Sequence, residues 1–228
     1  MSLPNISAMV PVDPPDPKKD LSKYESELLR YCDDPHYALE LKWDGFRGII
    51  LYDGDKVTLQ TKECKRHRNF VWLAERLRNI FKSIGVGNLI LDSEIVCLNE
   101  EGKPIFKNLW QRKDMPRCYV FDLLYYNGSD HRNFPYHDRK GRLEFFLRSN
   151  GLLVPTSLLL YSQHTFDPQE KRGLFYSALQ QDMEGGVFKH KNSIYGDVRL
   201  PWRKFRNPNY SQDYERARLF GRRPMRGI

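Results

Sequence analysis

The amino-acid sequence predicts an α+β fold in which antiparallel sheets are flanked by helices. Two observations support this prediction. Runs of β-type residues bounded by turn signals alternate with segments whose apolar residues recur at helical spacing. No repeat, coiled coil or linker divides the 228 residues, and a chain of this length buries enough surface to fold without disulfides or a structural metal. We therefore expect one domain.

The chain begins with a proline-rich stretch. Proline fixes φ and has no backbone N–H, so residues 1–20 are predicted to form an extended leader and not a helix. The next segment, residues 21–31, has apolar side chains at helical spacing, which predicts a helix, although a surface turn fits the same residues.

Three short β-type runs come next, at residues 37–41, 48–52 and 57–60. Asp53-Gly54-Asp55 separates the last two runs and favours a hairpin, because glycine accepts the positive φ of a tight turn. Residues 70–81 then carry an apolar stripe at helical spacing, which predicts an amphipathic helix.

Two longer apolar runs follow. Residues 89–98 are predicted to form a buried strand that a turn at residues 99–102 closes. Residues 118–126 are predicted to form another strand, which ends at the turn signal Asn127-Gly128.

The last third of the chain is predicted to hold two helices and two strands. Residues 138–150 form the first helix, with Asp138 as its N-cap and Gly151 just past its end. A second helix follows Pro168 and runs to about Gln181. The strands are predicted near residues 187–190 and 202–205.

Composition and charge narrow the class of function. The 37 lysines and arginines outnumber the 29 acidic residues and give a net charge of +8, which favours polyanionic partners. Cys32, Cys64, Cys97 and Cys118 lack the close spacing of a zinc or redox motif. The N-terminus has no apolar signal core, and the longest apolar run is too short to cross a bilayer. We expect no membrane association and an intracellular, cytoplasmic location, associated with the nucleoid if the source is bacterial.

The densest local motif is residues 40–48, Glu-Leu-Lys-Trp-Asp-Gly-Phe-Arg-Gly, in which Lys42 is followed by Asp-Gly and an arginine between two predicted strands. Alone, this pattern fits a hairpin turn with a solvated lysine. Four further blocks stand downstream, each at the end or edge of a predicted strand. They are residues 91–94 (Leu-Asp-Ser-Glu), 121–124 (Phe-Asp-Leu-Leu), 184–189 (Glu-Gly-Gly-Val-Phe-Lys) and 202–206 (Trp-Arg-Lys-Phe-Arg).

These five blocks, in this order, resemble the nucleotidyltransferase motifs that ATP-dependent DNA ligases, RNA ligases and mRNA capping enzymes share. The likeness to the ligase domains of bacterial end-joining DNA ligases extends over nearly the whole chain, and includes residues 9–13, 121–128 and 192–196. The fold that this resemblance implies is an ATP-grasp-like adenylation domain.

The chemistry of Lys42 imposes its own requirement. A free lysine has a pKa near 10.4, so only about one in a thousand is neutral and nucleophilic at neutral pH. Nearby cations and partial burial would disfavour the charged form, and Lys189, Lys204 and Arg206 are the candidates. The same cations would bind the phosphates of ATP and stabilise the charge that develops as pyrophosphate leaves.

The resemblance implies a role for each site residue. Lys42 attacks the α-phosphate of ATP and forms a phosphoramidate with AMP. Glu94 holds the ribose, Phe121 stacks on adenine, and Glu184, together with Glu94, places a divalent metal, for which Mg²⁺ or Mn²⁺ is expected. The ATP-binding set that we predict is Glu40, Leu41, Lys42, Arg47, Lys62, Glu94, Phe121, Lys189, Lys204 and Arg206.

Simpler interpretations exist for several of these residues. Phe121 and Trp202 could be core residues, Glu184 could cap a turn, and Lys62 lies in a charged run that is typical of a solvated or DNA-facing surface. Glu94 is more informative, because an unpaired carboxylate in an apolar strand is costly to bury. The resemblance also has two local departures. Arg206 stands where a lysine is usual, and Lys62 stands where an arginine is usual, which changes the geometry of phosphate contacts.

The resemblance also predicts the domain organisation. Ligases of this kind continue into an oligonucleotide-binding (OB) barrel, whereas only 22 residues follow Arg206 here. We expect a leader (1–20), an adenylation domain (21–207) and a basic tail (208–228) without the C-terminal OB-fold, either as a truncation or as a natural stand-alone domain. The tail contains Arg216, Arg218, Arg222, Arg223 and Arg226.

The predicted function is nick sealing in DNA repair by an ATP-dependent DNA ligase. Its partners would be nicked or broken double-stranded DNA and a repair protein that clamps the nick. Two alternatives stay open. One is an RNA ligase or capping-type nucleotidyltransferase, and the other is a nucleic-acid-binding module with weak or no ligation activity.

Overall fold

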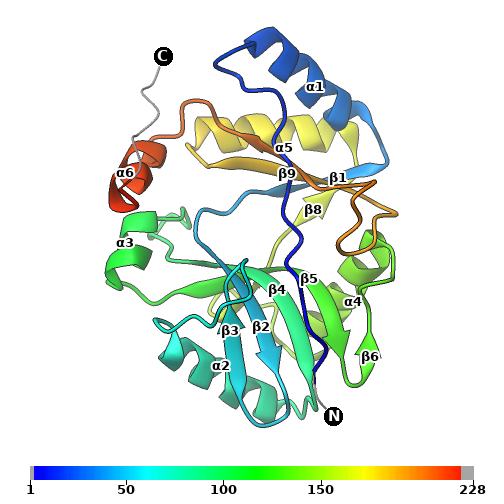
Figure 1. Cartoon of the computed structure of the whole chain (residues 1–228), viewed down its shortest axis with the longest axis vertical. Coiled ribbons are helices and arrows are strands. Elements are labelled where there is room, and N and C mark those ends of the chain that lie inside the picture. Colours follow the sequence, from blue (N-terminus) through cyan, green and yellow to red (C-terminus); the bar gives the residue numbers. More distant parts are fainter. Residues whose placement is uncertain (1–2, 222–228) are drawn as a thin grey trace.

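The computed structural model describes residues 3–221 and has the predicted α+β architecture. A small four-stranded sheet and a large six-stranded sheet pack against each other, and helices cover their outer faces (Figure 1). In the described residues, no helix is both long and apolar enough to span a membrane.

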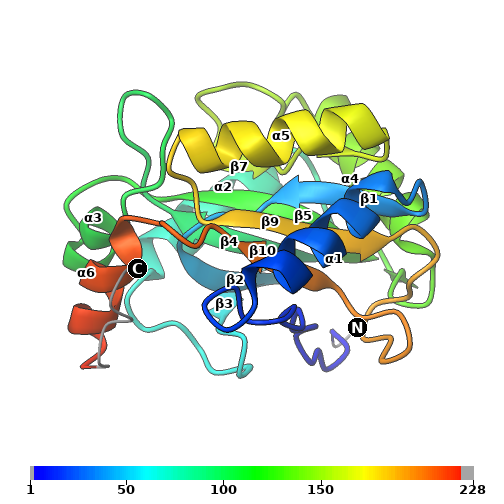
Figure 2. The same ribbon diagram turned by 90° about the horizontal axis from the view of Figure 1, so that it is seen from above.

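The small sheet has the strand order β10-β9-β1-β8, and its strands are antiparallel. Helices α1 and α5 lie on its outer face, where Leu39, Phe188 and Phe205 pack against Tyr24 and Phe175 (Figures 1 and 2). The elements are α1 (Leu21–Asp33), β1 (Tyr37–Leu41), β8 (His164–Thr165), α5 (Pro168–Gln180), β9 (Gly185–His190) and β10 (Arg203–Arg206).

The large sheet has the strand order β3-β2-β4-β5-β6, and β7 adds to β5 in parallel. Its outer face packs against α2 and α4 in a core that includes Leu73, Leu77, Leu91 and Phe146. The elements are β2 (Phe46–Tyr52), β3 (Val57–Gln60), α2 (Val71–Ser83), β4 (Leu89–Val96), β5 (Arg117–Tyr126), β6 (Ser129–Asp130), α4 (Tyr136–Ser149) and β7 (Leu159–Tyr161).

The inner faces of the two sheets meet in a third core, which includes Ile49, Ile90, Phe121 and Trp202. Alternation along a strand points successive side chains to opposite faces. In β1, Leu39 therefore faces the helices, and Glu40 faces the second sheet, where polar side chains surround a cavity.

The N-terminal leader is extended, as predicted, and it packs against the fold. The backbone N–H of Val12 donates to the Trp202 carbonyl at 2.8 Å, and the N–H of Lys204 donates to the Val12 carbonyl at 3.1 Å. Ile6 and Met9 are buried in the core between the sheets. The leader runs past the edge strand β10 of the small sheet and over central strands of the large sheet (Figure 1).

Most predicted elements agree with the structure, with differences at their ends. The predicted strands at 37–41 and 57–60 match β1 and β3 residue for residue, whereas β2 begins two residues before its predicted start. The proposed N-cap Asp138 is wrong. Helix α4 begins at Tyr136 after Pro135, so Asp138 lies inside its first turn. A carboxylate there is stabilised by the positive end of the helix dipole.

Some elements were not predicted. They include α3 (Phe106–Gln111), the short strands β6, β7 and β8, and α6 (Gln212–Leu219). Helix α6 lies in the segment that the sequence presented only as a basic tail, and it packs beside α3 at one end of the molecule (Figure 1). Arg222, Arg223 and Arg226 of that predicted tail lie outside the described residues.

Candidate active site

A cavity of ≈ 750 Å³ opens between the two sheets. Strands β1, β9 and β10 form one wall, strands β2, β4 and β5 form the other, and α6 lies at one end. All the predicted site residues line it, although they come from distant parts of the sequence. They are Glu40, Leu41, Lys42, Arg47, Lys62, Glu94, Phe121, Glu184, Lys189, Lys204 and Arg206.

Lys42 follows the last residue of β1, and its backbone N–H donates to the Gly185 carbonyl at 2.9 Å. Its Nζ donates to Oε2 of Glu184, the residue before β9. The side chains of Lys42 and Glu184 are only 18% and 8% exposed, so this ion pair is screened little by solvent. The direct neighbour of the candidate nucleophile is thus a carboxylate.

At two positions of the motifs, only glycine fits, because any side chain would clash with neighbouring backbone. A Cβ on Gly45 would lie 2.0 Å from the Ile95 carbonyl oxygen of the adjoining strand. A Cβ on Gly185, which has φ of 127°, would lie 2.1 Å from the Phe205 carbonyl oxygen. No side chain fits at either position, because backbone from a neighbouring strand occupies the space. These contacts fix the chain next to Lys42 and Glu184.

The C-terminal segment contributes Tyr210 and Arg216, and the sequence placed neither residue in the site, although it named Arg216 in the basic tail. The Tyr210 hydroxyl donates to Asp44 Oδ2 at 2.8 Å, and Nη1 of Arg216 on α6 donates to Asp44 Oδ1. Arg216 Nη1 also lies 3.9 Å from Glu184 Oε1. Asp44 therefore ties the lysine motif to α6, and no spacing in the sequence signals this contact.

The carboxylate of Glu40 lies at the centre of a buried network. Its Oε1 accepts from Lys189 Nζ at 2.7 Å and from the Tyr136 hydroxyl at 2.6 Å, and Lys140 Nζ lies 3.3 Å away. Burial alone would raise the pKa of Glu40, but Lys140 and Lys189 outweigh it and lower the pKa to about 2. Glu40 is therefore ionised, and its side chain is occupied by internal partners.

The cations that we expected beside Lys42 line the same cavity, but their contacts differ from the prediction. Lys189 pairs with Glu40, and Lys204 Nζ lies 3.1 Å from Asp13 of the leader. Arg206 is exposed at the cavity edge. The sequence suggested a group of cations, whereas the structure pairs Lys42, Lys189 and Lys204 each with an acid.

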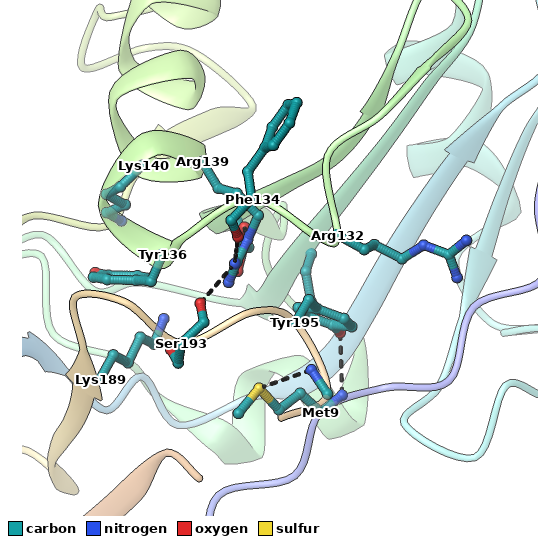
Figure 3. Close-up of polar contacts among 12 residues, drawn as sticks. Met9, Arg132, Phe134, Tyr136, Arg139, Lys140, Lys189, Ser193 and Tyr195 are labelled. Carbon is teal, nitrogen blue, oxygen red and sulfur yellow. Dashed lines mark hydrogen bonds and ion pairs between the residues drawn. The ribbon is translucent and has the colours of Figure 1, made fainter. Parts of the chain in front are cut away.

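Arg47 on β2 is held by a buried acid. Its Nε and Nη2 donate to the two carboxylate oxygens of Asp92, and Nη2 also donates to the Met9 carbonyl at 3.1 Å. The Tyr195 hydroxyl also donates to Asp92. The same hydroxyl accepts a hydrogen bond from the Met9 N–H (Figure 3). Burial would lower the pKa of Arg47, but Asp92 raises it further above its usual range. The guanidinium is charged and fixed in orientation.

Glu94 has a different environment from Asp92, its neighbour on β4. It faces the cavity, and among residues 3–221 we find no hydrogen bond or ion pair to its carboxylate. Burial raises the pKa of Glu94 to about 7, against the opposing effect of Lys42 and Arg47, while Glu184 and Asp92 raise it further. A carboxylate in this state gains most from an added hydrogen-bond donor or cation.

Two aromatic rings flank Lys189. Its Nζ lies 4.5 Å from the centre of the Phe121 ring and 4.1 Å from the centre of the Trp202 ring, which is cation–π range. The two rings meet edge to face at 5.9 Å. Trp202 is 1% exposed, which agrees with a packing role, and it also lines the cavity.

The cavity has a more exposed outer end. Lys62 is 62% exposed there and pairs with Glu63 at 3.6 Å. Phe46 and Trp110 line the same end, where their rings lie 6.2 Å apart. This end combines apolar surface with solvated charge.

Comparison with known proteins assigns the family. Residues 19–206 match the family model described as the ATP dependent DNA ligase domain, which covers most of the chain. The chain belongs to this family. The ligase domain is 33% identical over 180 residues to the multifunctional non-homologous end joining protein LigD of Pseudomonas aeruginosa, which covers 74% of this chain and 20% of that protein. It is 29% identical over 173 residues to a DNA ligase of Sulfolobus acidocaldarius, which covers 69% of this chain and 28% of that enzyme.

Solved structures share the fold of the ligase domain. A mycobacterial DNA ligase D complexed with ATP and MES aligns with a TM-score of 0.60 at 24% identity, over 75% of this chain and 54% of that one. An archaeal ATP-dependent RNA ligase aligns with a TM-score of 0.54 at 16% identity, over 86% of this chain and 48% of that one. The ligase domain spans about a fifth of the length of the LigD proteins that it matches.

The carboxylates of the ligase domain suit a divalent metal that takes its other ligands from phosphate and water. Within residues 3–221, no group of three acidic, histidine or cysteine side chains could hold a metal ion, and the cysteines there are free. Glu94 and Glu184 are the acidic candidates, and both line the cavity. Mg²⁺ is commonly held by one or two carboxylates, with phosphate oxygens and water as its other ligands. The residues present fit that arrangement.

Proposed function

We propose that the ligase domain transfers AMP from ATP to Lys42 and then to the 5′-phosphate of nicked DNA. One observation carries the proposal: a half-buried lysine, its carboxylate partner Glu184 and the other motif side chains line a single cavity. The family supports ATP as the nucleotide, and the LigD and DNA ligase relatives support DNA as the acceptor.

In the first step, the Nζ of Lys42 bonds to the α-phosphorus, and the bond from that phosphorus to the pyrophosphate oxygen breaks. The ammonium of Lys42 must lose one proton before attack and a second as the phosphoramidate forms. Glu184 contacts Nζ and is placed to accept the first proton, and the second passes to solvent. In the second step, a DNA 5′-phosphate oxygen replaces Lys42 on the same phosphorus.

The remaining residues would bind and orient the nucleotide. Lys189, Lys204 and Arg206 line the wall that is best suited to phosphates, and Phe121 offers a ring for stacking against the base. Glu94 lacks a partner within the described residues and would accept hydrogen bonds from ribose hydroxyls. A divalent metal held by Glu184 and Glu94 would supply positive charge to the phosphates.

The division into a leader (1–20), an adenylation domain (21–207) and a tail (208–228) stays a proposal. So do Mg²⁺ or Mn²⁺ as the metal and a repair protein that clamps the nick. The fold does not choose between DNA and RNA, because both kinds of ligase share it.

Mass spectrometry before and after incubation with ATP and Mg²⁺ tests the first step. The wild type should gain one AMP, about 329 Da. Lys42→Ala should gain nothing, because it lacks the nucleophile. Lys191→Ala, which changes a lysine outside the cavity lining, should label like the wild type. An unlabelled wild type across several metals and pH values would overturn the proposal.

Transfer from the labelled protein tests the acceptor. The adenylate should move to the 5′-phosphate of a nicked DNA duplex faster than to the same duplex with RNA at the nick. Faster transfer to RNA would instead identify an RNA ligase.

A further inference from the structure

A buried lysine of α4 lies behind the wall of the cavity. The side chain of Lys140 has no exposed surface, and its Nζ donates to the Ser162 carbonyl at 2.6 Å. The same Nζ lies 3.3 Å from Glu40 Oε1 and 4.4 Å from the centre of the Tyr161 ring. Burial of an ammonium group is costly, so its position calls for an explanation.

Lys140 shares its carboxylate with a residue of the site. Glu40 Oε1 accepts from Lys189 at 2.7 Å, and Lys189 lines the cavity between two aromatic rings. Tyr136, one turn before Lys140 on α4, donates to the same oxygen, and it lies between the two lysines in the view of Figure 3. With both lysines protonated, two positive charges share one negative charge.

We propose that Lys140 is a positioning residue for nucleotide binding, which holds Glu40 from the buried side and leaves Lys189 with positive charge available to an anion in the cavity. The anion would be a nucleotide phosphate, so the inference rests on the proposed function. Without Lys140, Glu40 would neutralise Lys189 alone, and the cavity would attract phosphate less strongly.

The groups around Lys140 set its charge. Burial lowers its pKa to about 8, with Lys189 in the same direction and Glu40 and Asp122 opposed. Glu40 stays ionised, because its pKa is about 2. His164 is neutral near pH 8, because burial and Lys140 lower its pKa to about 4. The phenol pKa of Tyr136 is raised well above its usual value, and that of Tyr161 is also raised. Glu144, which faces solvent, pairs with Arg148 at 2.7 Å.

This arrangement gives a pH dependence with a definite sign. Lys140 carries its charge below about pH 8 and loses it as the pH rises through that value. Wild-type affinity for a nucleotide should therefore fall above pH 8. Arginine keeps its charge in this range, so Lys140→Arg should show a smaller fall, and what remains would come from Lys189, whose pKa is also lowered by burial.

A second buried lysine provides a matched control. Lys171 on α5 is also fully buried, but its Nζ donates to the carbonyls of Tyr31, Asp34 and Tyr37 at 3.3, 2.6 and 2.9 Å. Tyr31 lies in α1, Asp34 follows this helix and Tyr37 begins β1, and none of the three lines the cavity. Lys171→Met should lower the melting temperature without changing nucleotide affinity.

The test is calorimetric binding of α,β-methylene-ATP, which cannot transfer AMP, between pH 6.5 and 9. At pH 7, Lys140→Met should raise the dissociation constant about 10- to 100-fold, the effect of one hydrogen bond to a charged group. It should also reduce the rise above pH 8 that the wild type shows. Melting curves confirm that each variant is folded.

Two results would overturn the inference. One is wild-type affinity in Lys140→Met, and the other is an equal weakening in Lys171→Met. AMP labelling of the wild type is scored separately. If the wild type is labelled with AMP but Lys140→Met binds the nucleotide with wild-type affinity, only the inference about Lys140 fails. If the wild type is not labelled but the variants bind the nucleotide as expected, only the proposed function fails.

Discussion

The two walls of the cavity differ in how they carry charge. On the small sheet, cations outnumber acids: Lys42, Lys189, Lys204 and Arg206 line the cavity with Glu40 and Glu184. On the large sheet, Arg47 is committed to Asp92, and the unpaired acid Glu94 faces the cavity. The difference teaches that each wall suits a different part of a nucleotide. Phosphates fit the lysine-rich wall, and hydroxyl groups or a metal fit the carboxylate.

The largest effect on stability is expected at the buried ion pair between Arg47 and Asp92 in the large-sheet wall. Asp92→Asn leaves the buried guanidinium of Arg47 without its charged partner, so stability should fall by about 3–5 kcal/mol, the usual loss when one partner of a buried ion pair is removed. Urea unfolding measures it. Tyr195→Phe, which removes only one hydrogen bond to Asp92, should cost about 1 kcal/mol. Equal losses in the two variants would show that the ion pair does not fix this wall.

The second prediction concerns the lysine-rich wall. Lys189→Met should slow AMP labelling about 100-fold, because one preorganised donor to developing charge typically contributes at least that much. The fold should persist, since Glu40 keeps Lys140 and Tyr136 as partners. Lys191→Met, two residues along the chain and outside the cavity lining, should label normally. If Lys189→Met and Lys191→Met were labelled with AMP at comparable rates, the lysine-rich wall would have no special role in phosphate binding.

The third prediction concerns the unpaired acid. Because the pKa of Glu94 is raised from 4.5 to about 7, the folded protein holds this proton more tightly than the unfolded chain. The resulting stabilisation is complete below pH 4.5 and is lost as the pH rises through 7. Glu94→Gln should therefore be more stable than the wild type at pH 8, by roughly 1–3 kcal/mol from about 1.4 kcal/mol per pKa unit, reduced by solvent in the cavity.

This gain should shrink as the pH falls and should vanish below about pH 4.5, which thermal unfolding at several pH values can check. Labelling with ATP should decrease at pH 8 even though the protein is more stable. A variant that is less stable than the wild type at pH 8 would mean that Glu94 has a partner that we have not identified.

The strands and the motif positions could be predicted, because hydrophobic alternation and motif order are local properties of the sequence. Other features depend on tertiary contacts. Helix α6 has no buried residue and therefore no apolar stripe to reveal it, and α3 has only six residues. The contacts of Arg216 with Asp44 and of Lys140 with Glu40 join residues that lie far apart in the chain. Asp138 was misplaced because α4 begins two residues earlier, after Pro135, which makes no side-chain cap hydrogen bond that a capping pattern could reveal.

The backbone contacts of Gly45 and Gly185 separate two kinds of information within the motifs. These glycines are required by the close approach of neighbouring strands, and any descendant that keeps this fold must keep that approach. Lys42, the nucleophile that we propose, would carry the transfer reaction, and a descendant could lose this reaction by a single substitution while the strands stayed in place. A motif match that rests on the glycines therefore indicates shared ancestry and fold, whereas the presence of Lys42 is the feature that distinguishes an active enzyme from an inactive descendant.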